Sequence, residues 1–154
     1  MYADAPDDAF AAITIRIPDN VQAQGYLAEL FRTPAHTAEE VMYRIDSACF
    51  LAEDPFVRAD HMVQRLTEDA LLNSELREVY EADMRDNLDD TVAAFALRDH
   101  TVGLDALADL GMLDAANIDH TIDVASRAGA VASCSYLLEM KTRRFKAGRR
   151  SFSL

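Results

Sequence analysis

Residues 74–99, SELREVYEADMRDNLDDTVAAFALRD, form the longest periodic stretch of the chain and decide its fold class. Apolar residues recur there at steps of three and four, which is the spacing of one face of an α-helix, and Asp and Glu dominate the opposite face. The triplet Asp89-Asp90-Thr91 can divide the stretch into two helices, with Asp90 or Thr91 capping the second. The stretch therefore predicts an amphipathic helix pair with the apolar residues Leu76, Val79, Tyr80, Met84, Leu88, Val92 and Phe95.

The flanking sequence also favours helices. Residues 56–154 contain no Pro and only four Gly, and an interior Pro costs a helix about 3 kcal/mol. Thr37 and Glu40 have the spacing of a capping box, Asp54 can cap a helix whose first residue is Pro55, and Ser74 is a further cap candidate. Further helices are predicted over residues 20–31, 102–110, 115–128 (or from 117) and 130–145, with Gly111 and Gly129 closing two of them.

One segment has a strand pattern. Ile13, Ile15 and Ile17 alternate with Thr14 and Arg16, and Pro18 follows. Because one strand is not stable alone, residues 11–17 either pair with another strand or dock as an extended arm. The sequence predicts an all-α fold in a single domain over residues 1–146, with a basic flexible tail at 147–154.

Charge is distributed very unevenly along the chain. Residues 1–140 carry nine Arg and no Lys against 27 Asp and Glu, a formal charge of −18. The last fourteen residues contain no carboxylate side chain and six cations. Such a field selects partners and association rates without dictating a fold. It disfavours direct nucleic-acid binding by the acidic part, because that binding neutralises phosphates with cations.

Composition favours an intracellular, cytoplasmic protein that neither spans nor binds a membrane. The N-terminus is acidic, and no apolar run approaches the roughly 20 residues of a membrane span. Two cysteines, Cys49 and Cys134, lie far apart. Buried reduced thiols are the simplest interpretation, with a disulfide or a reactive thiol as alternatives.

The stretch Ile122–Met140, IDVASRAGAVASCSYLLEM, resembles the helix pair of an ankyrin repeat. Ala125 stands four residues before Gly129, Val131 two after it, and Leu137 and Leu138 eight and nine after it. A fainter copy places Ala96, Arg98 and Val102 29 residues upstream of Ala125, Arg127 and Val131, so the resemblance covers about residues 92–145. His120-Thr121-Ile122-Asp123 replaces the Thr-Pro-Leu-His turn signature, and Asp109 stands where Leu is expected. The resemblance implies a protein-binding scaffold without an active site or cofactor.

The sequence offers no catalytic constellation. The four His form no metal-binding pair, and His61, with Glu68 seven residues on, falls short of the ligands that zinc needs. No carboxylate pair stands in the apolar setting that a general acid requires, and there is no phosphate-binding Gly loop. We expect no catalytic residue, no metal and no cofactor. A small enzyme or ligand-binding protein with a site near His61 is the alternative.

Function is therefore expected in surface contacts with a protein partner that has a basic surface. Two surfaces are candidates, an acidic face on the stretch 74–99 and a basic end. A more specific hypothesis is that the acidic face mimics a nucleic-acid backbone and inhibits a nucleic-acid-handling protein, as anti-CRISPR proteins do. The basic end is a solvated helix terminus, a segment docked on an acidic face of its own or another copy, or a nucleic-acid contact. A self-assembling homo-oligomer is a further alternative. The acidic face comprises Glu75, Glu78, Glu81, Asp86, Asp89 and Asp90, and the basic end comprises Lys141, Arg143, Arg144 and Lys146.

Overall fold

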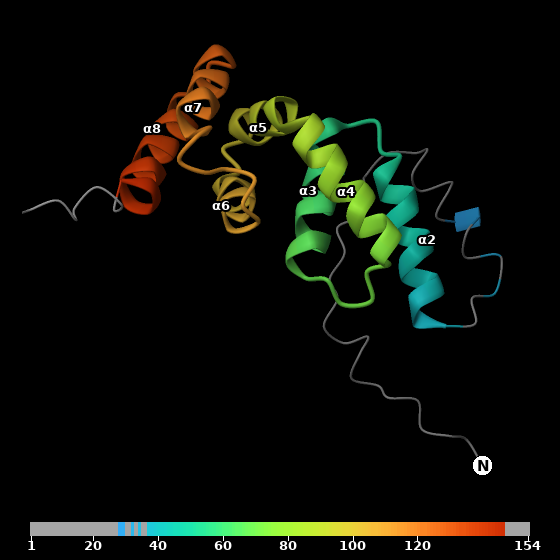
Figure 1. Cartoon of the computed structure of the whole chain (residues 1–154). Helices are drawn as coiled ribbons and strands as arrows, with labels where there is room; N and C mark the ends of the chain where they lie inside the picture. The colour runs from blue at the N-terminus through green and yellow to red at the C-terminus, as the bar shows by residue number, and fades with distance from the viewer. Residues whose placement is uncertain (1–27, 30–31, 33, 35–36, 147–154) are drawn as a thin grey trace, which may run out of the picture. The chain divides into compact units, whose positions relative to one another are not determined.

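The computed structural model describes residues 28–29, 32, 34 and 37–146, and within them the chain is all-α, as predicted (Figure 1). By its contacts the chain divides into two compact units, Met1–Val79 and Tyr80–Leu154, where the sequence predicts one domain. The helices are α2 (Ala38–Phe50), α3 (Pro55–Thr67), α4 (Ser74–Asp86), α5 (Leu88–Leu97), α6 (Thr101–Asp109), α7 (Ile118–Arg127) and α8 (Val131–Met140), followed by the π-helix η1 (Lys141–Phe145).

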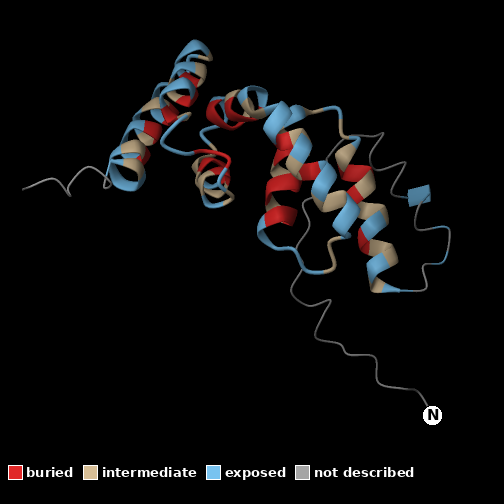
Figure 2. Cartoon of the chain, in the orientation of Figure 1, coloured by how far each residue is buried: buried red, intermediate tan, exposed pale blue. Residues whose placement is uncertain are grey.

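In the first unit, α2 packs against α3, and both begin at the predicted caps. The Thr37 hydroxyl accepts a hydrogen bond from the Glu40 backbone N–H at 3.1 Å. Asp54 accepts one from the Phe56 N–H at 2.9 Å, and Pro55 follows it as the first helical residue. These bonds satisfy amide groups that have no partner inside the helix. Buried and exposed residues alternate along each helix with the expected period (Figure 2).

Two predicted caps are wrong, because an Asn stands at each true helix start. Asn73, not Ser74, caps α4, and its Oδ1 accepts from the N–H groups of Glu75 at 2.9 Å and Leu76 at 3.2 Å. The stretch 74–99 does break into two helices, but at Asn87 and before Asp90 and Thr91. An Asn side chain bonds readily to nearby backbone and so favours helix boundaries over helix interiors.

The second unit contains two helix hairpins, α5–α6 and α7–α8, and α5 also packs against α7 and α8. The turn of each hairpin has one residue with positive φ, Asp99 at 50° and Gly129 at 76°. The backbone bonds that close the turns also match, because His100 N–H donates to Phe95 O at 2.9 Å and Ala130 N–H to Ala125 O at 3.1 Å. The register between the hairpins is therefore 30 residues, and the 29-residue offset predicted from Ala96 and Val102 is wrong by one.

The 30-residue register aligns residues with the same role in both hairpins. Asn87 and Asn117 precede the first helices, Thr91 and Thr121 are buried in them, and Leu107 and Leu137 are fully buried in the second helices. Burial differs on one side, since Ala96 is buried and its counterpart Ser126 is exposed.

Several predictions lie outside the described residues. They concern the strand or arm at 11–17, most of the helix at 20–31 and the tail at 147–154; residues 28–29 are helical. Among the described helices, none is long and apolar enough to cross a membrane.

Candidate functional site

A buried cluster of three polar side chains, Asp46, His61 and Arg65, joins α2 to α3 in the first unit. Asp46 is 0% exposed, His61 2% and Arg65 1%. The Asp46 carboxylate accepts hydrogen bonds from Arg65 Nε at 2.8 Å and Nη2 at 3.2 Å, and from His61 Nε2 at 3.0 Å. Charge-assisted bonds of this kind offset the cost of removing ions from water.

Arg65 extends this buried cluster into the connection between α3 and α4. Its Nη1 donates to the Glu68 carbonyl at 3.0 Å and its Nη2 to the Ala70 carbonyl at 2.9 Å. These bonds hold a segment in which Leu71 has a positive φ of 57°. The cluster thus fixes both the α2–α3 packing and the chain reversal that leads to α4.

The structure does not bring His61 together with Glu68. Helix α3 ends at Thr67, Glu68 is exposed, and the His61 ring instead contacts Asp46. Within residues 37–146 and the other described positions, no group of three or more potential metal ligands is found. His61 is thus a buried member of the polar contact between α2 and α3.

Sequence reasoning missed this buried cluster, although a signal for it existed. Met42, Asp46 and Cys49 follow one another at steps of four and three, so Asp46 occupies the buried stripe of α2. In α3, Arg65 stands four residues after His61 and next to buried Leu66. A charged residue at an apolar stripe position predicts a buried partner, but the partner's identity depends on tertiary contacts.

The two thiols differ in environment, and both are free. Cys49 is buried; burial, followed by the nearby Asp46 charge, raises its pKa to about 12. Cys134 is half-buried, with its Sγ 3.9 Å from the Ile122 carbonyl oxygen. The prediction of two buried free thiols is therefore confirmed for Cys49, whereas Cys134 is only half-buried.

At pH 8, we expect Cys49 to react with iodoacetamide roughly a thousandfold more slowly than an ordinary thiol, because a pKa near 12 leaves so little thiolate. Peptide mass spectrometry between pH 7 and 10 checks this, with Cys134 as the internal reference. The rate at Cys49 should rise with pH. Modification of both cysteines at equal rates in the folded protein would contradict the prediction.

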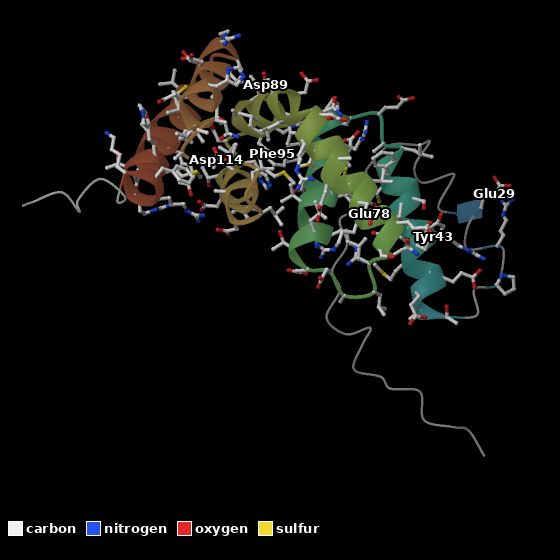
Figure 3. The ribbon with its side chains drawn as sticks, viewed as in Figure 1. Glu29, Tyr43, Glu78, Asp89, Phe95 and Asp114 are labelled. Carbon is white, nitrogen blue, oxygen red and sulfur yellow. The ribbon has the colours of Figure 1, made fainter. Side chains whose placement is uncertain are left out.

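The acidic face is divided between the two units. Glu75 and Glu78 belong to the first unit and are exposed (Glu78 is labelled in Figure 3). The other four members belong to the second unit. Glu81 is half-buried and pairs with Arg85 at 3.7 Å. Asp89 (labelled in Figure 3) belongs to α5, and its carboxylate lies 2.8 Å from Nε2 of His120 on α7. The two remaining members, Asp86 and Asp90, are exposed.

Three of the four residues of the basic end, Lys141, Arg143 and Arg144, lie against carboxylates of their own unit, and the fourth, Lys146, is exposed. Arg144 bonds to Asp109 at 2.6 Å and to Asp105 at 3.3 Å. Lys141 Nζ pairs with Asp119. The hydrogen bond to Asp109 raises the pKa of Arg144. Of the interpretations predicted for the basic end, these contacts match docking on an acidic face of the same chain.

A tyrosine and two weaker ion pairs complete this contact. Arg143 lies 3.7 Å from Asp105 and 3.8 Å from Glu139. The Tyr136 hydroxyl donates a hydrogen bond to Asp105, and burial together with that bond raises its pKa. Sequence reasoning missed the three carboxylates that receive the basic end, Asp105, Asp109 and Asp119, because they are 22 to 39 residues away from their partners. We call these three the receiving carboxylates.

Comparison with known protein families, curated proteins and solved structures finds no match for this chain.

Proposed function

We propose that this chain is a non-catalytic protein-binding module that receives a partner with a basic surface. One observation carries the proposal. Among the described residues, no hydrogen bond or ion pair engages the side chains of Glu75, Glu78, Asp86 or Asp90, all of which are exposed. The receiving carboxylates, by contrast, are neutralised by the basic end.

Exposed carboxylates of like charge repel one another, and a partner's cations relieve this repulsion. Asp86 and Asp90 lie on either side of Asn87, where α4 ends and α5 begins. Complementary charges of this kind accelerate association and select the partner more than they raise affinity. The packed hairpins of the second unit would hold the carboxylates of α5 on a rigid support. The resemblance to ankyrin repeats implies a protein-binding scaffold, which agrees with this proposal, and it remains a prediction.

We expect the variant Asp86→Asn/Asp90→Asn to weaken binding to a protein partner about three- to thirtyfold at low salt, mainly through slower association. The partner is captured from the native host at low salt and identified by mass spectrometry. Binding is then measured by surface plasmon resonance over a salt series. Asp123→Lys, at an exposed carboxylate in the middle of α7, is the matched control, because it changes the net charge by two, as the double variant does.

Two results would count against the acidic face as the binding surface. One is an affinity that does not change from low to high salt. The other is a loss of equal size in the Asp123→Lys control, which would indicate an effect of total charge. The corresponding pair in the first unit, Glu75→Gln/Glu78→Gln, reports separately whether that unit contributes.

A sharper form of the proposal is that the acidic face imitates a nucleic-acid backbone and inhibits a nucleic-acid-handling protein. Its support is the set of exposed carboxylates without described partners in a chain whose first 140 residues carry −18. A competition experiment distinguishes this form from general protein binding. If the acidic face imitates nucleic acid, added DNA or RNA should displace the module from its partner. Failure of nucleic acid to compete would leave only the general form.

A further inference from the structure

The π-helix η1 is an unusual continuation of α8. Its backbone closes with a hydrogen bond from the Lys146 N–H to the Lys141 carbonyl at 3.0 Å, a five-residue step. Such helices are rare and often occur at functional sites. None of the five residues of η1 is buried. The segment is therefore an exposed strap in a specific backbone conformation.

The strap places three cations on the receiving carboxylates of two other helices. Arg144 contacts Asp105 and Asp109 on α6, Arg143 contacts Asp105, and Lys141 contacts Asp119 on α7. The carboxylates remain partly open to solvent, with exposed side-chain fractions of 33% for Asp105, 63% for Asp109 and 73% for Asp119. Exposed ion pairs of this kind are individually weak, so another cationic segment can replace them.

The chemistry of this contact is the chemistry proposed for the partner. The guanidinium group of Arg144 and the ammonium group of Lys141, both on the strap, bind the receiving carboxylates. A partner with a basic surface would present the same two kinds of cation. While the strap is seated, its cations occupy the receiving carboxylates, and Glu75, Glu78, Asp86 and Asp90 of the acidic face are the members without a described partner. The strap thus reduces the acidic surface that a basic partner meets.

We propose that η1 is an autoinhibitory strap that competes with the Arg- and Lys-rich surface of the partner for Asp105, Asp109 and Asp119. This inference rests on the proposed function, because the competitor of the strap is the same basic partner, which would contact the receiving carboxylates in addition to the acidic face. Binding of the partner at full strength requires release of the strap. Weakening the strap therefore strengthens binding of a polycation.

The test uses the full chain with Lys141→Gln/Arg143→Gln/Arg144→Gln and a fluorescent polyarginine peptide as the probe. We expect anisotropy titration at low salt to give a dissociation constant about five- to thirtyfold lower than for the unsubstituted chain. Removing three cations also makes the protein more acidic overall. The matched control is Arg98→Gln/Arg127→Gln/Lys146→Gln, which removes the same charge from the same unit but leaves the cations of the strap in place. Circular dichroism verifies that both variants stay helical.

A gain confined to the strap variant, and removed by adding Asp105→Asn/Asp109→Asn, supports the proposal. Equal gains in the strap variant and the control overturn it, because total charge then explains the result. No gain in either variant also overturns it. An independent readout is limited trypsin digestion, in which Asp105→Asn/Asp109→Asn should accelerate cleavage after Lys141, Arg143 and Arg144. The proposed function fails separately, if Asp86→Asn/Asp90→Asn leaves partner binding unchanged.

Discussion

Replacing Asp46 by Ala is expected to lower the free energy of unfolding of the first unit by about 3–5 kcal/mol. The substitution leaves the Arg65 guanidinium and the His61 ring in a site where they are 1% and 2% exposed, without the carboxylate that accepts their hydrogen bonds. Breaking a buried ion pair from one side is this costly because the remaining charge is neither solvated nor neutralised. A loss of this size approaches the whole stability of a small domain.

Hydrogen exchange of the intact protein measures this effect unit by unit. Amides of α2 and α3 should lose protection by roughly two to three and a half orders of magnitude, while those of α7 and α8 serve as an internal reference. The control is Asp46→Leu/His61→Leu/Arg65→Met, which replaces all three polar side chains with apolar ones of similar volume. It should recover much of the loss, because no charge is then left buried. Unchanged protection in Asp46→Ala would show that the buried cluster does not stabilise the unit.

Replacing Phe95 by Ala should destabilise the second unit by about 3–5 kcal/mol. Phe95 (labelled in Figure 3) is 0% exposed. Its ring lies edge-on to that of His100, at 5.1 Å between centroids. Truncation removes apolar contacts and leaves a cavity that rigid neighbouring helices cannot close. Urea unfolding followed by circular dichroism, with hydrogen exchange of α5 and α6, measures the loss. The control is Leu97→Ala, because Leu97 lies two residues after Phe95 and its side chain is 64% exposed. This substitution should change the free energy of unfolding by less than about 0.5 kcal/mol.

Gly103 provides a second check on the Phe95 site. A Cβ at Gly103 would lie 2.7 Å from Phe95 Cε2 and 2.4 Å from His100 Cδ2, closer than real contacts allow. Gly103→Ala should therefore be destabilising on its own and less so when Phe95 is already Ala, with the contact to His100 remaining. Strictly additive effects in this double-mutant cycle would show that Gly103 and Phe95 do not share the same packing space.

Local features of the sequence predicted the helices well, because caps and periodicity act within a few residues. Thr37 and Asp54 cap as expected, and Gly111 and Gly129 take positive φ at helix ends. The errors at Ser74 and Asp90 arose where several capping residues stand side by side and propensity alone cannot choose. The N-cap position of α4 is Asn73, one residue before Ser74, and that of α5 is Asn87, three residues before Asp90.

The spacing of small residues in the sequence was not enough to fix the register between the two hairpins. Small residues such as Ala96 and Ala125 recur at many spacings, so 29 and 30 residues both match the sequence. The backbone decides for 30, because Asp99 rather than His100 takes the left-handed conformation that Gly129 has in the second turn. Asp tolerates that conformation better than most residues, and a sequence search for Gly alone overlooks it.

By itself, the sequence determined the all-α class, most helix boundaries and the separation of an acidic body from a basic end. These properties follow from periodicity, capping and composition, all of which are local or additive. Only the tertiary structure decided that Asp46, His61 and Arg65 form a buried cluster and that the basic end is seated on Asp105, Asp109 and Asp119. Their partners lie 15 to 39 residues apart, and side-chain electrostatics acts through distance in space, which the order of residues along a chain does not specify.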